Sequence, residues 1–148
     1  SVDHLEFTGP DEMQALKGSG TMPTILPGAA FFLGMQYAPA REMIENGLPV
    51  AMASDFNPGS SPSGNMQLIL SMASILYRLT PEQAINATTL NTAYAMGLEK
   101  ELGSVDVGKK ANLIITKPIN GIEYLPYAFG DNKVAKVIIN GNLVHENQ

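Results

Sequence analysis

The sequence has no cysteine among its 148 residues, so disulfide bonds and metal sites built on thiolates are excluded. Basic residues are also few, since nine Lys and Arg stand against 14 Asp and Glu, for a formal net charge of −5. These basic residues form no cluster, and the charge pattern therefore argues against binding to nucleic acid. No apolar run reaches the length of a membrane-spanning helix, and we expect a soluble, cytoplasmic protein.

The overall composition is that of a folded chain. Hydrophobic residues make up 45% and charged residues 16% of the sequence, which is typical of globular rather than disordered proteins. This length can form one domain or two small ones. The opening residues, Val2–Glu6, read as the tail of a strand, as though the sequence came from the middle of a longer protein.

The first part of the sequence predicts strands that alternate with helices. Strands are expected at Val2–Glu6, Thr21–Leu26 and Leu48–Ala53, and the dipeptide Pro27-Gly28 reads as the stop of the second one. A helix is expected over Pro39–Asn46. This alternation predicts βαβ units, and hence an α/β fold with a parallel sheet.

Further helices follow from local signals. Pro10 suits the first turn of a short helix before the second strand. Apolar residues recur at helical spacing over Met66–Leu79, which predicts a helix with a broad buried face. Thr80 can cap the next helix, with Gln83 completing a capping box, and a short helix is expected over Leu90–Met96.

The last third of the sequence reads as β structure. Short apolar runs punctuated by Gly and Asn predict strands at Ser104–Val107, Asn112–Thr116, Val134–Asn140 and Asn142–Glu146. The dipeptide Asn140-Gly141 between two such runs predicts a two-residue hairpin turn. We place a domain boundary between residues 98 and 102, which divides the chain into segments 1–98 and 99–148.

Asp55 is the first candidate for chemistry. It follows the third predicted strand and precedes a turn-rich loop, Asn57–Gly64, and then a helix. In α/β proteins, the carboxyl ends of parallel strands are where active sites form. Asp55 is therefore a candidate metal ligand or general base, while the alternative is that it only caps the loop or the helix.

The two histidines differ in position. His4 ends the first predicted strand and would share an edge with Asp55, which favours a functional role, although a lone histidine is more often structural. His145 lies near the end of the last predicted strand and reads as a surface residue. The loop Asn57–Gly64 offers N–H groups that favour anions, or is an ordinary Gly/Pro/Ser loop. One Asp and one His are too few for a catalytic zinc or iron site, which takes about three protein ligands.

Several strings together carry a family resemblance. The string Ser54-Asp-Phe-Asn-Pro-Gly-Ser-Ser-Pro62, with Leu26-Pro-Gly28 and Val2-Asp-His-Leu5 upstream, resembles the imidazolonepropionase family of the metal-dependent amidohydrolase superfamily. The resemblance continues through Thr89-Leu-Asn-Thr-Ala93 to Gly103-Ser-Val-Asp-Val-Gly-Lys-Lys-Ala111. Superfamily members usually have Asp after that last string, where this chain has Asn112.

The resemblance implies a fold and a place in it. The family has a (β/α)8 barrel and a small β-sandwich assembled from both ends of the chain. His4 would end the sixth barrel strand and Asp55 the eighth, so residues 1–98 would form the last strands and helices of the barrel. Residues 99–148 would be the C-terminal share of the sandwich. The family's other histidine ligands come from earlier strands and have no counterpart here, so the chain is expected to be the C-terminal portion of the enzyme.

The resemblance also implies a reaction. The family hydrolyses 4-imidazolone-5-propanoate to N-formimidoyl-L-glutamate in histidine degradation, with one divalent ion, zinc or iron. Asp55 would ligate the metal and shuttle a proton, and His4 would orient the attacking water or stabilise the oxyanion. The substrate would be held by Asn57, Gly59 and Ser60.

Partners and alternatives remain open from the sequence alone. The resemblance implies that the chain acts with the remainder of the enzyme or with a second copy, as a homodimer. One alternative is another cyclic amidohydrolase or a deaminase of the same superfamily. The other is a non-catalytic module that binds a partner through an exposed sheet edge.

Overall fold

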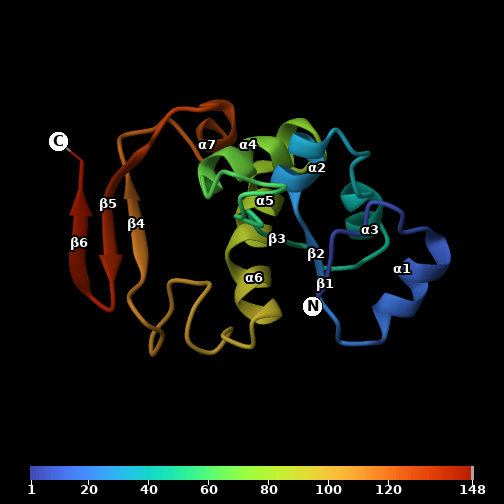
Figure 1. Cartoon of the computed structure of the whole chain (residues 1–148). Coiled ribbons are helices and arrows are strands. Elements are labelled where there is room, and N and C mark those ends of the chain that lie inside the picture. The colour runs from blue at the N-terminus through green and yellow to red at the C-terminus, as the bar shows by residue number, and fades with distance from the viewer. Residues whose placement is uncertain (148) are drawn as a thin grey trace.

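The computed structural model describes residues 1–147 and contains two separate three-stranded sheets (Figure 1). The first sheet is parallel, in the order β1-β2-β3, and its strands are β1 (Val2–Asp3), β2 (Pro23–Ile25) and β3 (Ala51–Met52). The second is antiparallel, in the order β4-β5-β6, with β4 (Leu113–Thr116), β5 (Val134–Ile139) and β6 (Asn142–Glu146). The predicted parallel sheet is thus confirmed, with strands shorter than expected.

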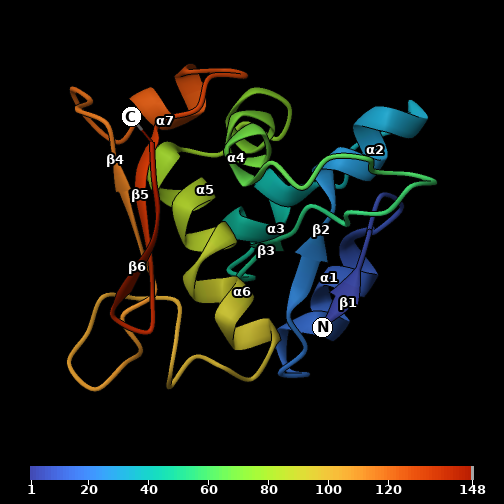
Figure 2. The same ribbon diagram turned by 60° about the vertical axis from the view of Figure 1, so that its left-hand side comes forward.

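Seven helices are present in residues 1–147, and those labelled α5 and α6 lie between the two sheets (Figures 1 and 2). Their bounds are α1 (Pro10–Lys17), α2 (Pro27–Leu33), α3 (Ala40–Glu45), α4 (Met66–Ile75), α5 (Pro81–Thr88), α6 (Leu90–Ala95) and α7 (Tyr124–Tyr127). The predicted capping box forms, because the Thr80 side chain accepts a hydrogen bond from the Gln83 N–H and the Gln83 side chain accepts one from the Thr80 N–H.

The structure corrects two of the predictions. Pro27-Gly28 does not simply stop a strand, because Pro27 begins helix α2, where the missing N–H of proline costs nothing. The predicted strand Ser104–Val107 does not form: these residues are a loop, in which Val105 and Val107 are 86% and 101% exposed. An apolar run becomes a strand only when a neighbouring strand satisfies its backbone groups, and none in residues 1–147 pairs with this run.

The core lies between the parallel sheet and the helices. On the sheet side, the core contains the fully buried Ile25, Val50 and Met52. The helices contribute Met43 of α3 and Met72 of α4, among others. Polar side chains from α6 fix β3 at the same time. Asn91 donates a hydrogen bond to the Val50 carbonyl oxygen at 2.8 Å, and Thr92 donates one to the Met52 carbonyl oxygen at 3.1 Å. Strand β3, which leads into Asp55, is therefore held by both packing and hydrogen bonds.

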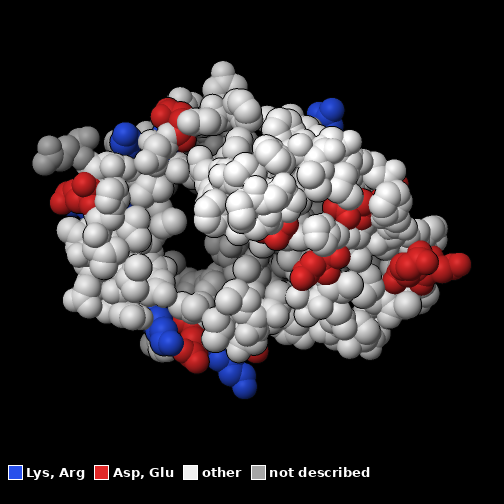
Figure 3. Space-filling model, viewed as in Figure 1, with Lys and Arg blue, Asp and Glu red and all other residues white. Residues whose placement is uncertain are grey.

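The antiparallel sheet is much less covered. None of its strand residues is buried, and Figure 3 shows an opening between it and the helices. Asn140 and Gly141 have φ angles of 49° and 81°, as the predicted two-residue hairpin turn requires. The sheet is tied to α4 through Gln67, whose side chain accepts a hydrogen bond from the Lys133 N–H at 2.8 Å. No helix within residues 1–147 combines the length and apolarity needed to cross a membrane.

Candidate active site

The candidate site lies where the three parallel strands end, which we call the carboxyl edge. His4 follows β1 directly, and Asp55 lies three residues after the end of β3. Strand β2 lies between these two strands. Because all three strands run in the same direction, both residues belong to one edge of the sheet, as the sequence predicted.

The backbone at this edge is strained. His4 and Leu5 both have φ of 74°, and Asp55 has φ of 51°, in the left-handed region that side chains disfavour. Only two other non-glycine residues within 1–147, Arg78 and Asn140, have positive φ. Such residues cost about 1–3 kcal/mol each and gather at functional sites, where the surroundings hold them in place. The concentration of strain at the carboxyl edge supports its assignment as the site.

The segment that follows β3, residues 53–65, is called here the Asp55 loop. Asn57 organises it, because its Oδ1 accepts hydrogen bonds from the N–H groups of Gly59 at 2.9 Å and Ser60 at 2.8 Å. The Asn57 Nδ2 donates to the Asp55 carbonyl oxygen at 2.7 Å. The N–H groups of Gly59 and Ser60, which the sequence offered to a substrate, are thus engaged inside the loop, and Asn57 shapes the loop.

A further hydrogen bond closes the Asp55 loop on itself, beside Gly28 of helix α2. The buried Ser61 hydroxyl donates a hydrogen bond of 2.6 Å to the carbonyl oxygen of Ser54, the residue before Asp55. Gly28 makes room for this hydroxyl, since a Cβ at Gly28 would lie 2.5 Å from Ser61 Oγ and 3.2 Å from the Ser54 oxygen. In the string Leu26-Pro-Gly28, Gly28 therefore leaves the space that the hydrogen bond between Ser61 and Ser54 occupies. The Pro-Gly pair alone did not reveal this role.

Replacing Gly28 by Ala is expected to destabilise the protein by about 1–3 kcal/mol, because the new methyl group must displace Ser61 and break its bond to Ser54. The matched control is Gly18→Ala, since Gly18 has φ of −103° and open space where a Cβ would lie. Chemical denaturation of the two variants measures the difference. Equal stability of the two variants would contradict this reading of the contact.

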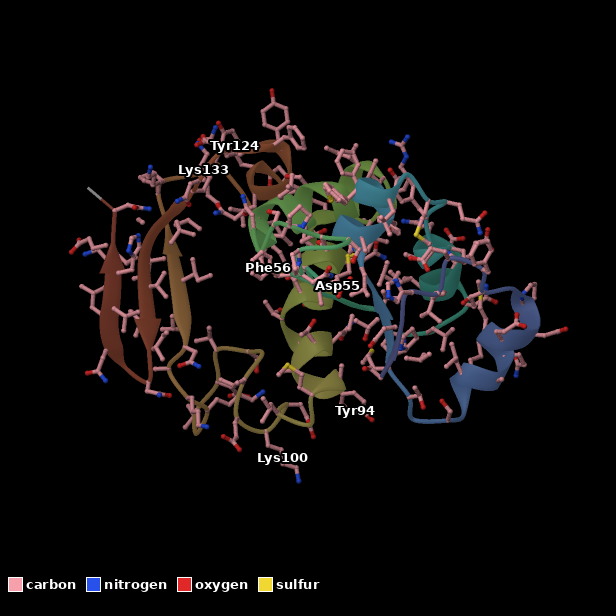
Figure 4. All side chains as sticks on the ribbon, in the orientation of Figure 1. Asp55, Phe56, Tyr94, Lys100, Tyr124 and Lys133 are labelled. Carbon is pink, nitrogen blue, oxygen red and sulfur yellow. The ribbon has the colours of Figure 1, made fainter. Side chains whose placement is uncertain are left out.

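The electrostatics of Asp55 suit a cation. Its side chain is half-buried, and within residues 1–147 no Lys, Arg or His forms an ion pair with it. The Ser60 hydroxyl donates a long hydrogen bond of 3.5 Å to Asp55 Oδ2. In Figure 4, Asp55 and the exposed Phe56 lie near the middle of the molecule, to the right of the antiparallel sheet.

The described residues do not complete a metal site by themselves. No group of three or more His, Cys, Asp and Glu side chains within residues 1–147 is arranged to hold a metal ion. Asp55 and His4 have donor types that zinc and iron accept, but an open catalytic site takes about three protein ligands. His145 does not contribute, because it lies exposed on β6 and contacts Asn147 Oδ1 at 3.0 Å.

Sequence reasoning missed one residue at this edge, Glu6. Its carboxylate is buried, and its Oε1 lies 3.6 Å from Nδ1 of His4, whose side chain is half exposed. The available signal was an acidic residue two positions after the candidate histidine. That signal is weak, because only the turn at His4 and Leu5 brings the two side chains together.

Comparison with known proteins identifies close relatives by sequence. The chain is 56% identical over 144 residues to the imidazolonepropionase of Flavobacterium johnsoniae, an alignment that covers 97% of this chain and 35% of that protein. It is 44% identical over 145 residues to the imidazolonepropionase of Bacillus velezensis, covering 97% of this chain and 34% of that protein. The chain thus spans about a third of the length of the curated relatives that it matches.

Solved structures show the same fold in more distant proteins. An adenosine deaminase from Xanthomonas campestris with bound zinc superposes with a TM-score of 0.86 at 24% identity, covering 95% of this chain and 36% of that one. The guanine deaminase of E. coli gives a TM-score of 0.82 at 20% identity, covering 99% of this chain and 39% of that one. Since residues 4–144 also match the amidohydrolase family, the chain belongs to that family.

Proposed function

We propose that the complete protein containing this chain hydrolyses 4-imidazolone-5-propanoate to N-formimidoyl-L-glutamate in histidine degradation. The observation that carries this proposal is the 56% identity to an imidazolonepropionase over 97% of the chain. The Asp55 loop supports it, with its internal hydrogen bonds and with a carboxylate that forms no ion pair within residues 1–147. Since the chain spans about a third of such relatives, the activity belongs to the complete protein.

In this proposal Asp55 would hold one divalent ion, zinc or iron, together with ligands from outside this chain. Such an ion acts as a Lewis acid and lowers the pKa of water so that it attacks at neutral pH. Asp55 would also take up the proton released during the attack, since a carboxylate has two oxygens and no cationic side chain within residues 1–147 forms an ion pair with it. The strained backbone and the contacts of Asn57 keep the carboxylate in place for this role.

His4 would act on the substrate side of the reaction. Water adds to the ring carbonyl carbon, the ring C–N bond breaks, and the leaving nitrogen takes up the proton. A half-exposed imidazole at the carboxyl edge can orient the water or donate a hydrogen bond to the oxyanion that develops. Asn57, Gly59 and Ser60 would contribute to substrate binding in different ways. Asn57 and Gly59 would shape the loop through their internal hydrogen bonds, and the Ser60 hydroxyl, beside Asp55 Oδ2, would be the group that meets the substrate.

Replacing His4 by Ala in the complete protein is expected to lower kcat by about 10²–10³, because that is the usual cost of losing one donor to the oxyanion. Metal content should stay near that of the unmodified protein, since His4 is assigned to the substrate and not to the ion. His145→Ala, on exposed β6, is the matched control and should leave kcat unchanged. Stoichiometric loss of metal from the His4 variant would instead make His4 a metal ligand.

The remaining assignments concern assembly. Residues 1–98 would supply the last strands and helices of the barrel, and residues 99–148 the C-terminal strands of a small β-sandwich. The edge strands β1 and β3 would pair with the rest of the cytoplasmic enzyme, which would form a homodimer. The uncovered strands β4–β6 support the completion of the sandwich by further strands, since exposed apolar side chains such as Leu143 and Val144 are typical of a surface that packs against a partner.

The test is the substrate range of the complete protein. Because two structures of the same fold are purine deaminases, imidazolonepropanoate should be compared with adenosine and guanine. Turnover of imidazolonepropanoate far above that of either purine compound supports the proposal. A preference for a purine substrate would assign the protein to the deaminases of the superfamily instead.

A further inference from the structure

Glu6 is the one charged side chain that is buried within residues 1–147. Its side chain is 5% exposed, and the only ion-pair contact that it makes in this part of the chain is with His4. The distance of 3.6 Å between Glu6 Oε1 and His4 Nδ1 is longer than a hydrogen bond, as is common in catalytic pairs before substrate binds. A buried carboxylate is unfavourable unless it is paired, so His4 is the partner that makes this placement tolerable.

The position of Glu6 is fixed by its backbone. His4 and Leu5, both with left-handed φ, turn the chain away from β1, and the Thr8 N–H closes this turn on the Leu5 carbonyl oxygen at 3.2 Å. From the connection between α2 and α3, Gln36 Nε2 donates a hydrogen bond of 2.6 Å to the Glu6 carbonyl oxygen. The turn brings the side chains of His4 and Glu6 close together, and the hydrogen bond from Gln36 holds the backbone of Glu6 in this position.

The charge of Glu6 also acts on a neutral group, the hydroxyl of Tyr77. Burial raises the pKa of Tyr77 above its ordinary value, and the negative charge of Glu6 and then Tyr37 raise it further. The Tyr77 hydroxyl therefore stays protonated, and its ring packs on Tyr37 with centroids 5.3 Å apart. A neutral hydroxyl supplies no positive charge, and the ion-pair contact that Glu6 makes within residues 1–147 is with the imidazole of His4.

We propose that Glu6 is a positioning residue that holds the imidazole of His4 through Nδ1 and leaves Nε2 to face the reacting group. This inference rests on the proposed role of His4. A carboxylate at Nδ1 fixes the proton on that nitrogen, orients the ring and stabilises the imidazolium form when the ring is protonated. Glu6 would not itself touch the substrate, because its side chain is buried beneath the edge.

The test is a double-mutant cycle in the complete protein with Glu6→Gln, His4→Ala and the combined variant. Loss of such a partner typically costs about 10- to 100-fold in activity, and we expect that loss in kcat for Glu6→Gln with KM nearly unchanged. In the His4→Ala background the same change should have almost no effect, because Glu6 acts through His4. Glu42→Gln, an exposed acid of α3, is the matched control and should leave kcat unchanged. Losses that multiply in the combined variant would overturn the proposal, since they would show that Glu6 acts independently.

A second measurement does not depend on activity. In protein labelled with ¹⁵N-histidine, the His4 signals, identified by their loss in His4→Ala, should show the Nδ1-protonated ring. Glu6→Gln should shift the ring toward the Nε2-protonated form, and an unchanged spectrum would overturn the proposal. If Glu6→Gln does not fold, Glu6→Asp, which keeps the charge with a shorter reach, takes its place in both experiments with a smaller expected effect. If the unmodified protein does not turn over imidazolonepropanoate, the proposed function fails, while the spectrum still decides whether Glu6 holds His4.

Discussion

Replacement of Asp55 by Asn in the complete protein is expected to lower kcat at least about a thousandfold and to weaken metal retention. The substitution keeps the shape of the side chain but removes its charge and its capacity to take up a proton. General-base catalysis alone is worth roughly 10²–10⁴ in rate, and the loss of an anionic ligand adds to this. The half-buried carboxylate has no ion-pair partner in residues 1–147, so nothing in this part of the chain would replace its charge.

The measurement combines steady-state kinetics with metal analysis on the same preparations. Asp106→Asn is the matched control, because Asp106 is exposed in the loop before β4 and its Oδ1 accepts a hydrogen bond from the Val107 N–H, which an Asn side chain can also do. The control should match the unmodified protein in both measurements. If the Asp55 variant keeps a near-normal kcat and its full metal content, Asp55 is neither ligand nor base.

The parts of the fold that local chemistry dictates were predictable from the sequence. Thr80 and Gln83 cap α5 as their spacing indicates, and Asn140-Gly141 makes the hairpin turn because both residues tolerate positive φ. The position of Asp55 after a buried strand also followed from the sequence, because parallel strands place their carboxyl ends at one edge. In each case the signal lies within a few residues of the feature.

The parts that depend on distant contacts were not predictable. Pro27 begins a helix that looked like a strand stop, since proline suits both positions and only the packing of α2 against α4 distinguishes them. The contact of Gly28 with Ser61 joins residues 33 positions apart, so neither string reveals it alone. The pairing of Glu6 with His4 depends on left-handed backbone at His4 and Leu5, which few non-glycine residues adopt and which the sequence does not signal at Leu5.

The chain of 148 residues on its own is expected to show no hydrolysis of imidazolonepropanoate and no tight binding of zinc or iron. Residues 1–147 bring Asp55 and His4 to one edge but contain no group of three metal-binding side chains. With one carboxylate ligand, an ion stays mostly hydrated and its water remains insufficiently acidic at neutral pH.

Geometry leads to the same expectation. The three parallel strands form an open sheet, and a barrel closes only when tilt and register agree around the full ring of strands. Without that closure, the outer strands β1 and β3 have no neighbours on their open sides, and the carboxyl edge is not held in place. Any ordered form should pair these open edges with another copy or with the rest of the enzyme. The purified chain should be analysed for bound zinc and iron, assayed for loss of imidazolonepropanoate, and sized by light scattering. Stoichiometric metal together with turnover would show that this chain alone supplies enough ligands for the metal ion and the reaction. The assignment of further ligands to the complete protein would then be wrong.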